Sequence, residues 1–217
     1  MGSEQQRNVI WARFCALYLP DTVSRYLDLP TLEDGSDPEF AMHYKLWNAY
    51  SDVLARIQHT PYFSKYLRSN KPIAAPGKRL PSVIAERLLE AAPHLDRRMR
   101  VGTPDRPTHF YQDFTAACVR FLGALLASFV KLPDQEAVVQ TATRQGLLPW
   151  FKRWDELYGL ATSCDVFNDT LSITMSLLSP SDDVRSTARV VRKHLINLHR
   201  CALPSCDATG NFKACIK

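Results

Sequence analysis

The chain has 217 residues, of which 46% are hydrophobic and 23% are charged, and its formal net charge is +5 at pH 7. This length excludes a disulfide-stapled miniprotein and is short for two independent domains. The composition excludes a chain disordered throughout, a collagen-like fibre and a coiled-coil rod. The net charge permits an acidic partner, but solvated Lys and Arg on helix surfaces explain it equally well. We therefore expect a soluble, folded protein.

Cysteine usage and the N-terminal sequence indicate the compartment. The six cysteines fall well below the density of a disulfide framework, and Cys15, Cys118 and Cys164 lie within apolar periodic segments, where a thiol is usually a small buried group. The segment Val9–Leu19 is apolar, but Arg13 interrupts it and no small-residue cleavage site follows, so it predicts a helix rather than a secretion signal. We expect an intracellular protein, cytoplasmic or nuclear, with reduced thiols.

The first half of the chain carries helix signals separated by proline-rich connections. The sequence Ser36–Glu39 forms a capping box that includes a proline, and apolar residues then recur near the 3.6-residue period up to about His59. The stretch 70–81 contains several prolines, so we predict a connection there, followed by a shorter helix over 82–92. Prolines also predict a second loop over about 101–109.

The segment Phe110–Val130 is the most apolar part of the chain, and its two apolar stripes predict a helix that is buried on most sides. A membrane span is the competing interpretation. However, Arg120 lies in the middle of the segment, and the uninterrupted apolar stretch is shorter than the roughly 20 residues that a bilayer requires. We therefore favour a buried core helix.

The second half of the chain continues the helical pattern. Pro133 predicts the start of a helix that ends at Gly146, and the sequence Gly146–Trp150 predicts a helix C-cap directly before the next helix. Two further helices are predicted over about 164–178 and over 182–200. No convincing strand pair or hairpin turn is present in the sequence.

These patterns predict an all-α fold, with a helical domain over 1–200 and a short non-helical tail over 201–217. The sequence Gly146–Pro149 resembles the start of the last helix in armadillo-like repeats, although no second copy follows at a period of about 40 residues. We expect an irregular helical array or an armadillo-like bundle, with a single helical bundle as the alternative. The predicted core includes Trp47, Phe114, Phe121, Leu125, Trp150 and Val191.

The tail after Arg200 has no helical stripe and contains three closely spaced thiols, Cys201, Cys206 and Cys215. Two thiolates across a tight proline-containing turn can point at one metal ion, and tetrahedral zinc then requires two more ligands. His194 and His199 lie just upstream and could supplement the thiols. An irregular tail with incidental cysteines is the alternative that the spacing alone leaves open.

The tail resembles the opening of a MYND-type zinc finger, of the kind that follows a long helical region in many fungal proteins. In that family seven Cys and one His bind two zinc ions in an interleaved way. The resemblance implies that Cys201 and Cys206 form the first Cys pair and that Cys215 begins the second pair. It places the partner of Cys215 directly after Lys217, so that both zinc sites are incomplete in the chain. It also implies a protein-interaction scaffold that binds zinc once the finger is completed.

One motif favours an enzyme. The sequence Asn168–Ser172 resembles the second magnesium motif of terpene cyclases, which are all-helical enzymes that bind diphosphate. However, Ser176 stands where that motif needs Glu, and no aspartate-rich partner motif lies upstream. A nucleophile elbow, a His-Glu-x-x-His motif and a phosphate loop are also missing from the sequence. We expect no catalytic activity and no small-molecule substrate, and we keep a terpene cyclase relative as the alternative.

Two basic clusters make phosphate binding conceivable. One is expected on the last helix and the other in a loop; their residues are Arg185, Arg189, Arg192 and Lys193, and Arg97, Arg98 and Arg100. Aromatic residues do not interleave with either cluster, so solvated charged faces are the simpler interpretation. We expect a protein partner and neither a nucleic acid nor a membrane.

Overall fold

The computed structural model describes residues 4–30, 38–58, 60–102, 108–129, 138–158 and 165–179. Within these ranges the chain forms α-helices and one short 3-10 helix and no strand, which confirms the predicted all-α fold. The elements are α1 (Glu4–Leu27), α2 (Pro38–Ile57), α3 (Pro61–Arg68), η1 (Pro72–Ala74), α4 (Ala75–Val101), α5 (Thr108–Phe129), α6 (Thr141–Tyr158) and α7 (Asp165–Leu178). The helix predicted over 182–200 and the tail over 201–217 lie outside the described residues.

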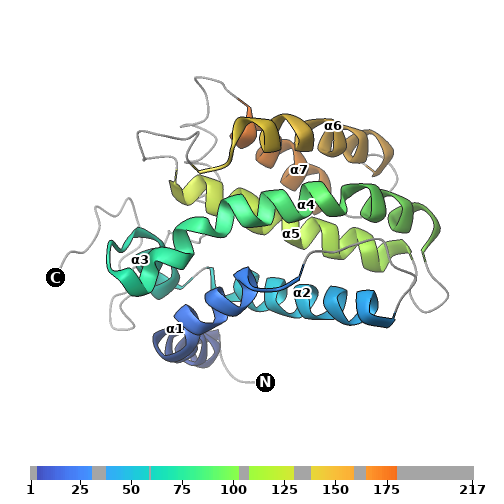
Figure 1. Ribbon diagram of the computed structural model, residues 1–217. Coiled ribbons are helices and arrows are strands. Elements are labelled where there is room, and N and C mark those ends of the chain that lie inside the picture. The colour runs from blue at the N-terminus through green and yellow to red at the C-terminus, as the bar shows by residue number, and fades with distance from the viewer. Residues whose placement is uncertain are drawn as a thin grey trace.

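The helices stack in three layers around the long pair α4 and α5 (Figure 1). Helices α6 and α7 cover one side of this pair, where α6 packs on α4 and α7 packs on α5. Helices α1 and α2 cover the other side, with α1 against α4 and α2 against α5, and α3 lies at one end. The central pair is therefore enclosed on both sides, which explains the apolar character of α5.

The predicted core is confirmed at four of its positions. Trp47, Phe114, Phe121 and Leu125 are buried, and the rings of Trp47 and Phe114 meet edge to face with centroids 5.0 Å apart. Trp150 is only partly buried and packs at the edge of the core. Val191 lies outside the described residues.

Helix α4 begins earlier and ends later than the sequence predicts. The predicted connection over 70–81 holds the 3-10 helix η1 and then the first turns of α4, which runs on through Pro81 and Pro93 to Val101. Pro76 costs little in the first turn, because its missing N–H has no helical partner there. Along the rest of α4, burial of residues such as Leu80 and Leu95 outweighs the local cost of the internal prolines.

Helix α6 is continuous through the predicted break. Gly146 and Pro149 lie inside one helix, so neither a C-cap nor a new helix start is present there, and the armadillo-like motif falls in the middle of the element. An ideal Cβ on Gly146 would lie 2.9 Å from Cδ2 of Leu89 on α4. The glycine thus allows α4 and α6 to approach closely. A close approach between helices, rather than a helix C-cap, therefore explains the glycine at this position.

The helix predicted from Pro133 to Gly146 is wrong in its bounds, because residues 138–140 are not helical and α6 begins at Thr141. The other predicted elements agree with the structure. Val9–Leu19 is helical and forms part of α1, the helix after the capping box ends at Ile57, and α5 and α7 match the predicted ranges within two residues. The predicted loop near 101–109 begins after α4, where Gly102 adopts a φ of 71°. None of the helices in the described part of the chain combines the length and the apolarity that are needed to cross a membrane.

Candidate functional site

The outward face of α1 carries several large apolar side chains that are exposed. Ile10, Leu17 and Tyr18 are 63%, 68% and 53% exposed, and Phe14 lies among them, partly buried. The spacings of four, three and one residues place these side chains on one side of a helix. We call this set the α1 outward face.

The opposite side of the same helix belongs to the core. Cys15, Leu19, Val23 and Tyr26 are buried there, where α1 packs against α2, α3 and α4. Helix α1 is therefore apolar on both sides between Val9 and Leu19, although it occupies the edge of the molecule (Figure 1). A helix that is apolar all round is normally covered on all sides, which makes the α1 outward face a candidate contact surface.

Aromatic rings pack against one another along the α1 outward face. The ring of Phe14 stands between Trp11, at a centroid distance of 6.0 Å, and Tyr18, at 5.6 Å. Aromatic groups of this kind offer a large contact area for little conformational entropy. Two exposed charged residues, Arg13 and Asp21, flank the apolar side chains, and neither has an ion-pair partner among the described residues.

A buried arginine of α4 fixes the position of α1. The Arg87 guanidinium donates hydrogen bonds to the carbonyl oxygens of Tyr26, Leu27 and Leu29, with distances of 2.9 Å to Leu27 and 2.6 Å to Leu29. It also lies over the Tyr26 ring, 5.1 Å from the centroid. Because the last carbonyls of a helix lack partners within the helix, Arg87 caps α1 and anchors it on α4.

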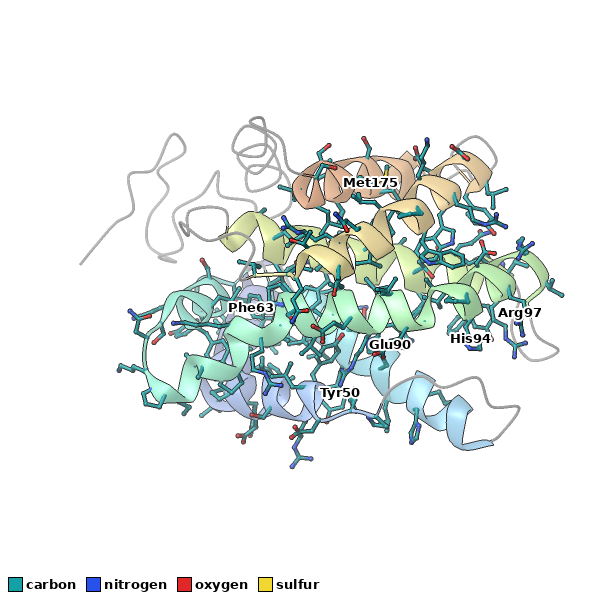
Figure 2. The ribbon with its side chains drawn as sticks, turned by 45° about the horizontal axis from the view of Figure 1, so that its top comes forward. Tyr50, Phe63, Glu90, His94, Arg97 and Met175 are labelled. Carbon is teal, nitrogen blue, oxygen red and sulfur yellow. The ribbon has the colours of Figure 1, made fainter. Side chains whose placement is uncertain are left out.

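A second feature is a surface pocket of about 500 Å³ between α4 and α6. We call it the arginine pocket; it is lined by Pro93, Asp96, Arg97, Arg100, Pro149, Trp150 and Arg153. Arg97 lies near the C-terminal end of α4, beyond Glu90 and His94 (Figure 2). At the base, the Asp96 side chain is only 4% exposed.

Two arginines share the Asp96 carboxylate. Arg100 donates to Oδ2 at 2.7 Å from one turn further along α4, and the Arg153 Nε of α6 donates to Oδ1 at 3.1 Å. The network therefore ties α6 to α4. Burial raises the pKa of the nearby Tyr158 hydroxyl, the negative charge of Asp96 raises it further, and the two guanidinium groups oppose both effects.

The predicted loop cluster of arginines belongs to the last turns of α4 instead. Arg98 donates to the Gly102 carbonyl at 3.5 Å and Arg100 donates to the Asp96 backbone carbonyl at 3.3 Å as well as to its carboxylate. Arginines are favoured at this end of a helix because they complement its partial negative charge. Arg98 thus contributes to the cap at the end of α4, and Arg100 binds Asp96 one turn earlier in the same helix. The second basic cluster, Arg185 to Lys193, lies outside the described residues.

The thiols of Cys15 and Cys118 are buried, as predicted. Burial raises the pKa of Cys118 to about 12, and it raises the pKa of Cys15, whose sulfur lies 3.2 Å from the Thr60 hydroxyl oxygen. The described residues contain no group of three or more His, Cys, Asp or Glu side chains that could hold a metal ion.

The candidate zinc ligands Cys201, Cys206 and Cys215, together with Cys164, His194 and His199, lie outside the described residues. Of the magnesium-type motif Asn168–Ser172 on α7, only the last two side chains are described, and Ser172 is exposed. Ser176, at the position of the missing Glu, donates its hydroxyl to the Ser172 carbonyl at 3.0 Å. Its side chain is thus engaged with its own helix.

Comparison with known proteins gives no relative: no family model, no curated protein and no solved structure matches the chain.

The sequence interpretation missed both surface features. The apolar residues of Val9–Leu19 predict a helix, but they lie on both of its faces, and only the packing of α1 shows which face is exposed. Asp96 and Arg153 are 57 residues apart in the sequence, and no local pattern links them.

Proposed function

We propose that this protein is a non-enzymatic helical scaffold that binds another protein chain through the α1 outward face. The observation that carries the proposal is the 68% exposure of Leu17 at the centre of an apolar surface on a helix that is also apolar on its buried side. Contiguous apolar patches on a protein surface commonly mark contact sites, whereas single exposed apolar residues do not.

The anchoring of α1 supports this proposal. Arg87 holds the C-terminal end of α1, and the buried residues Leu19 and Val23 hold its inner side, so the outward face is presented on a fixed element. A preorganised surface loses little conformational entropy when a partner binds. Burial raises the pKa of Cys15 and Cys118 and so keeps both thiols in their protonated, weakly nucleophilic form.

The second part of the proposal concerns the tail. By their resemblance to a MYND-type finger, Cys201, Cys206 and Cys215 would contribute thiolates to two interleaved zinc sites. Such a finger would add a second protein-binding module to the helical scaffold. The spacing of these thiols after a long helical region supports this assignment.

Site-specific cross-linking tests the binding surface. A photoreactive amino acid placed at Leu17 should cross-link to another protein chain in cells that express the full-length protein. The matched control is Leu157 of α6, which is also an exposed leucine, at 44%, on a different layer of the molecule. Cross-links from position 17 that are absent from position 157 support the proposal. Equal labelling from both positions, or none from position 17, contradicts it.

Metal analysis tests the tail. Three thiolates divided between two tetrahedral sites cannot fill either site, and partly filled sites lose most of the roughly 10–16 kcal/mol that a complete zinc site supplies. We expect less than stoichiometric zinc in the 217-residue chain after dialysis against a mild chelator. Tightly bound zinc that disappears with Cys201→Ala would contradict incomplete sites, and its loss with His199→Ala would identify an extra ligand.

A further inference from the structure

We propose that the partner of the α1 outward face is a second copy of this chain, with the two α1 helices packed antiparallel around a two-fold axis at Leu17. The inference rests on the proposed function and names the partner of the same surface. It follows from the arrangement of apolar and charged residues on α1, which is complementary to itself.

The register follows from helix geometry. Helix α1 is one continuous helix that contains Pro20. With 3.6 residues per turn, positions seven apart in a regular helix lie almost on one line, and Ile10, Leu17 and Ser24 are spaced in this way on the outer side of α1. In an antiparallel pair centred on Leu17, a residue that precedes Leu17 by a given number of positions lies level with the partner's residue that follows Leu17 by the same number. Leu17 then meets the partner's Leu17, and Ile10 meets the partner's Ser24.

The same register pairs opposite charges. Arg13 precedes Leu17 by four residues and Asp21 follows it by four, so Arg13 lies level with the partner's Asp21. Both side chains lie within about 40° of the line through Leu17, on its two sides, because each residue turns the helix by about 100°. The long arginine side chain reaches across the contact to the carboxylate. The two-fold axis repeats the pair, so the interface contains two salt bridges.

The exposure of Arg13, Asp21 and the neighbouring apolar residues in a single chain supports the pairing. Arg13 and Asp21 are exposed and have no ion-pair partner among the described residues, and the apolar side chains of Leu17 and Tyr18 between them are more than half exposed. In a two-fold arrangement, the positive charge four residues before Leu17 faces the negative charge four residues after the partner's Leu17. Isologous interfaces require this kind of self-complementarity.

The area of the α1 outward face limits the expected affinity of the dimer. A stable interface buries about 800 Å² on each partner, and one face of a single helix supplies only part of such an area. We therefore expect a reversible dimer with a dissociation constant in the micromolar range. Partly exposed salt bridges contribute mainly to register and specificity, and the apolar contacts contribute most of the affinity.

Charge reversal tests the register. Arg13→Asp brings the new carboxylate level with the partner's Asp21, and Asp21→Arg brings the new guanidinium level with the partner's Arg13, so each change replaces attraction by repulsion. Each single variant should weaken the dimer at least tenfold in light-scattering measurements of mass across the micromolar range. The double variant Arg13→Asp/Asp21→Arg should recover the affinity of the natural chain. Lys152→Asp, an exposed reversal on α6, should leave the dimer unchanged.

Mixing the two single variants tests the register more directly. The Arg13→Asp chain carries two negative charges on this face and the Asp21→Arg chain carries two positive charges, so the mixture should form a one-to-one heterodimer that neither variant forms with itself. Circular dichroism checks that both variants keep the helix content of the natural chain. Failure of the mixture to pair, or a natural chain that stays monomeric at high micromolar concentration, overturns the dimer. Cross-links from Leu17 to a different protein would then leave the proposed function standing.

Discussion

Two buried tryptophans differ in what their indole N–H groups contact. Trp47 donates to the Tyr26 hydroxyl oxygen at 2.8 Å, whereas the Trp154 Nε1 is buried with no hydrogen-bond partner among the described residues. A buried hydrogen bond stabilises a protein by about 1 kcal/mol net, whereas an unpaired buried donor costs about 1–3 kcal/mol.

Replacement of each tryptophan by phenylalanine separates these two cases. Both changes remove the same indole volume, so Trp47→Phe should lower the free energy of unfolding by at least about 1 kcal/mol more than Trp154→Phe, because the first loses a hydrogen bond and the second removes an unpaired donor. Urea denaturation curves of the two variants and the natural chain supply the comparison. An equal loss, or a larger loss for Trp154→Phe, would be the opposite of this expectation.

A buried cysteine thiol and a buried tyrosine hydroxyl make the stability of the fold sensitive to alkaline pH. Burial raises the pKa of Cys118 from an ordinary value of 9.0 to about 12 and the pKa of Tyr26 from 10.0 to about 12. As the pH rises above 9, the unfolded chain releases these protons first, so their contribution to stability is complete below pH 9 and is lost toward pH 12.

The pH dependence of unfolding measures this effect. Between pH 9 and 10, the range below the ordinary pKa of tyrosine, the free energy of unfolding should fall by about 1 kcal/mol per pH unit for the Cys118 thiol. Cys118→Ala should remove that part of the slope. A slope that is unchanged in Cys118→Ala would show that this thiol is not buried in its protonated form.

At the scale of the helices, one ion network joins two layers. Asp96 of α4 is buried and is shared by Arg100 and by Arg153 of α6, whereas the pair Asp52 and Arg56 lies within one turn of α2 with both side chains more than half exposed. Solvent and salt screen exposed pairs strongly, so the first network should matter more than the second.

Double-mutant cycles compare the two pairs directly. We expect a coupling energy of about 1 kcal/mol between Asp96 and Arg153 with Asp96→Asn and Arg153→Met, and about 0.3 kcal/mol between Asp52 and Arg56 with the same types of change. Both cycles are measured by urea denaturation at low salt. Equal coupling energies would mean that the α4–α6 network adds nothing beyond an ordinary surface pair.

The helices also show how far local sequence signals reach. The capping box and the 3.6-residue apolar period predict α2, α5 and α7, because start signals and burial agree there. At Pro81 and Gly146 the local signals predict breaks, but burial of α4 and the contact between Gly146 and Leu89 favour continuous helices. Such contacts join distant parts of the chain and leave no local pattern.

At the scale of the whole molecule, the three-layer arrangement explains which surfaces could be predicted. The sequence indicates that Val9–Leu19 is helical and apolar, but only the packing of α1 at the edge of the molecule shows that Ile10 and Leu17 face outward. The arginine pocket depends on the contact of α4 with α6 and has no sequence signature. The predicted ligands Cys201, Cys206 and Cys215 depend on the tail alone, and their zinc binding remains a prediction.

Association through the α1 outward face is the central claim, and sedimentation equilibrium tests it most directly. Across the micromolar range, the apparent mass of the natural chain and of Leu157→Asp should rise from 24.6 kDa toward twice that value. Leu17→Asp should stay at 24.6 kDa, because it places two carboxylates together at the two-fold axis and removes the central apolar contact. A natural chain of 24.6 kDa at every concentration, or an equal rise in mass for Leu17→Asp, would contradict the account.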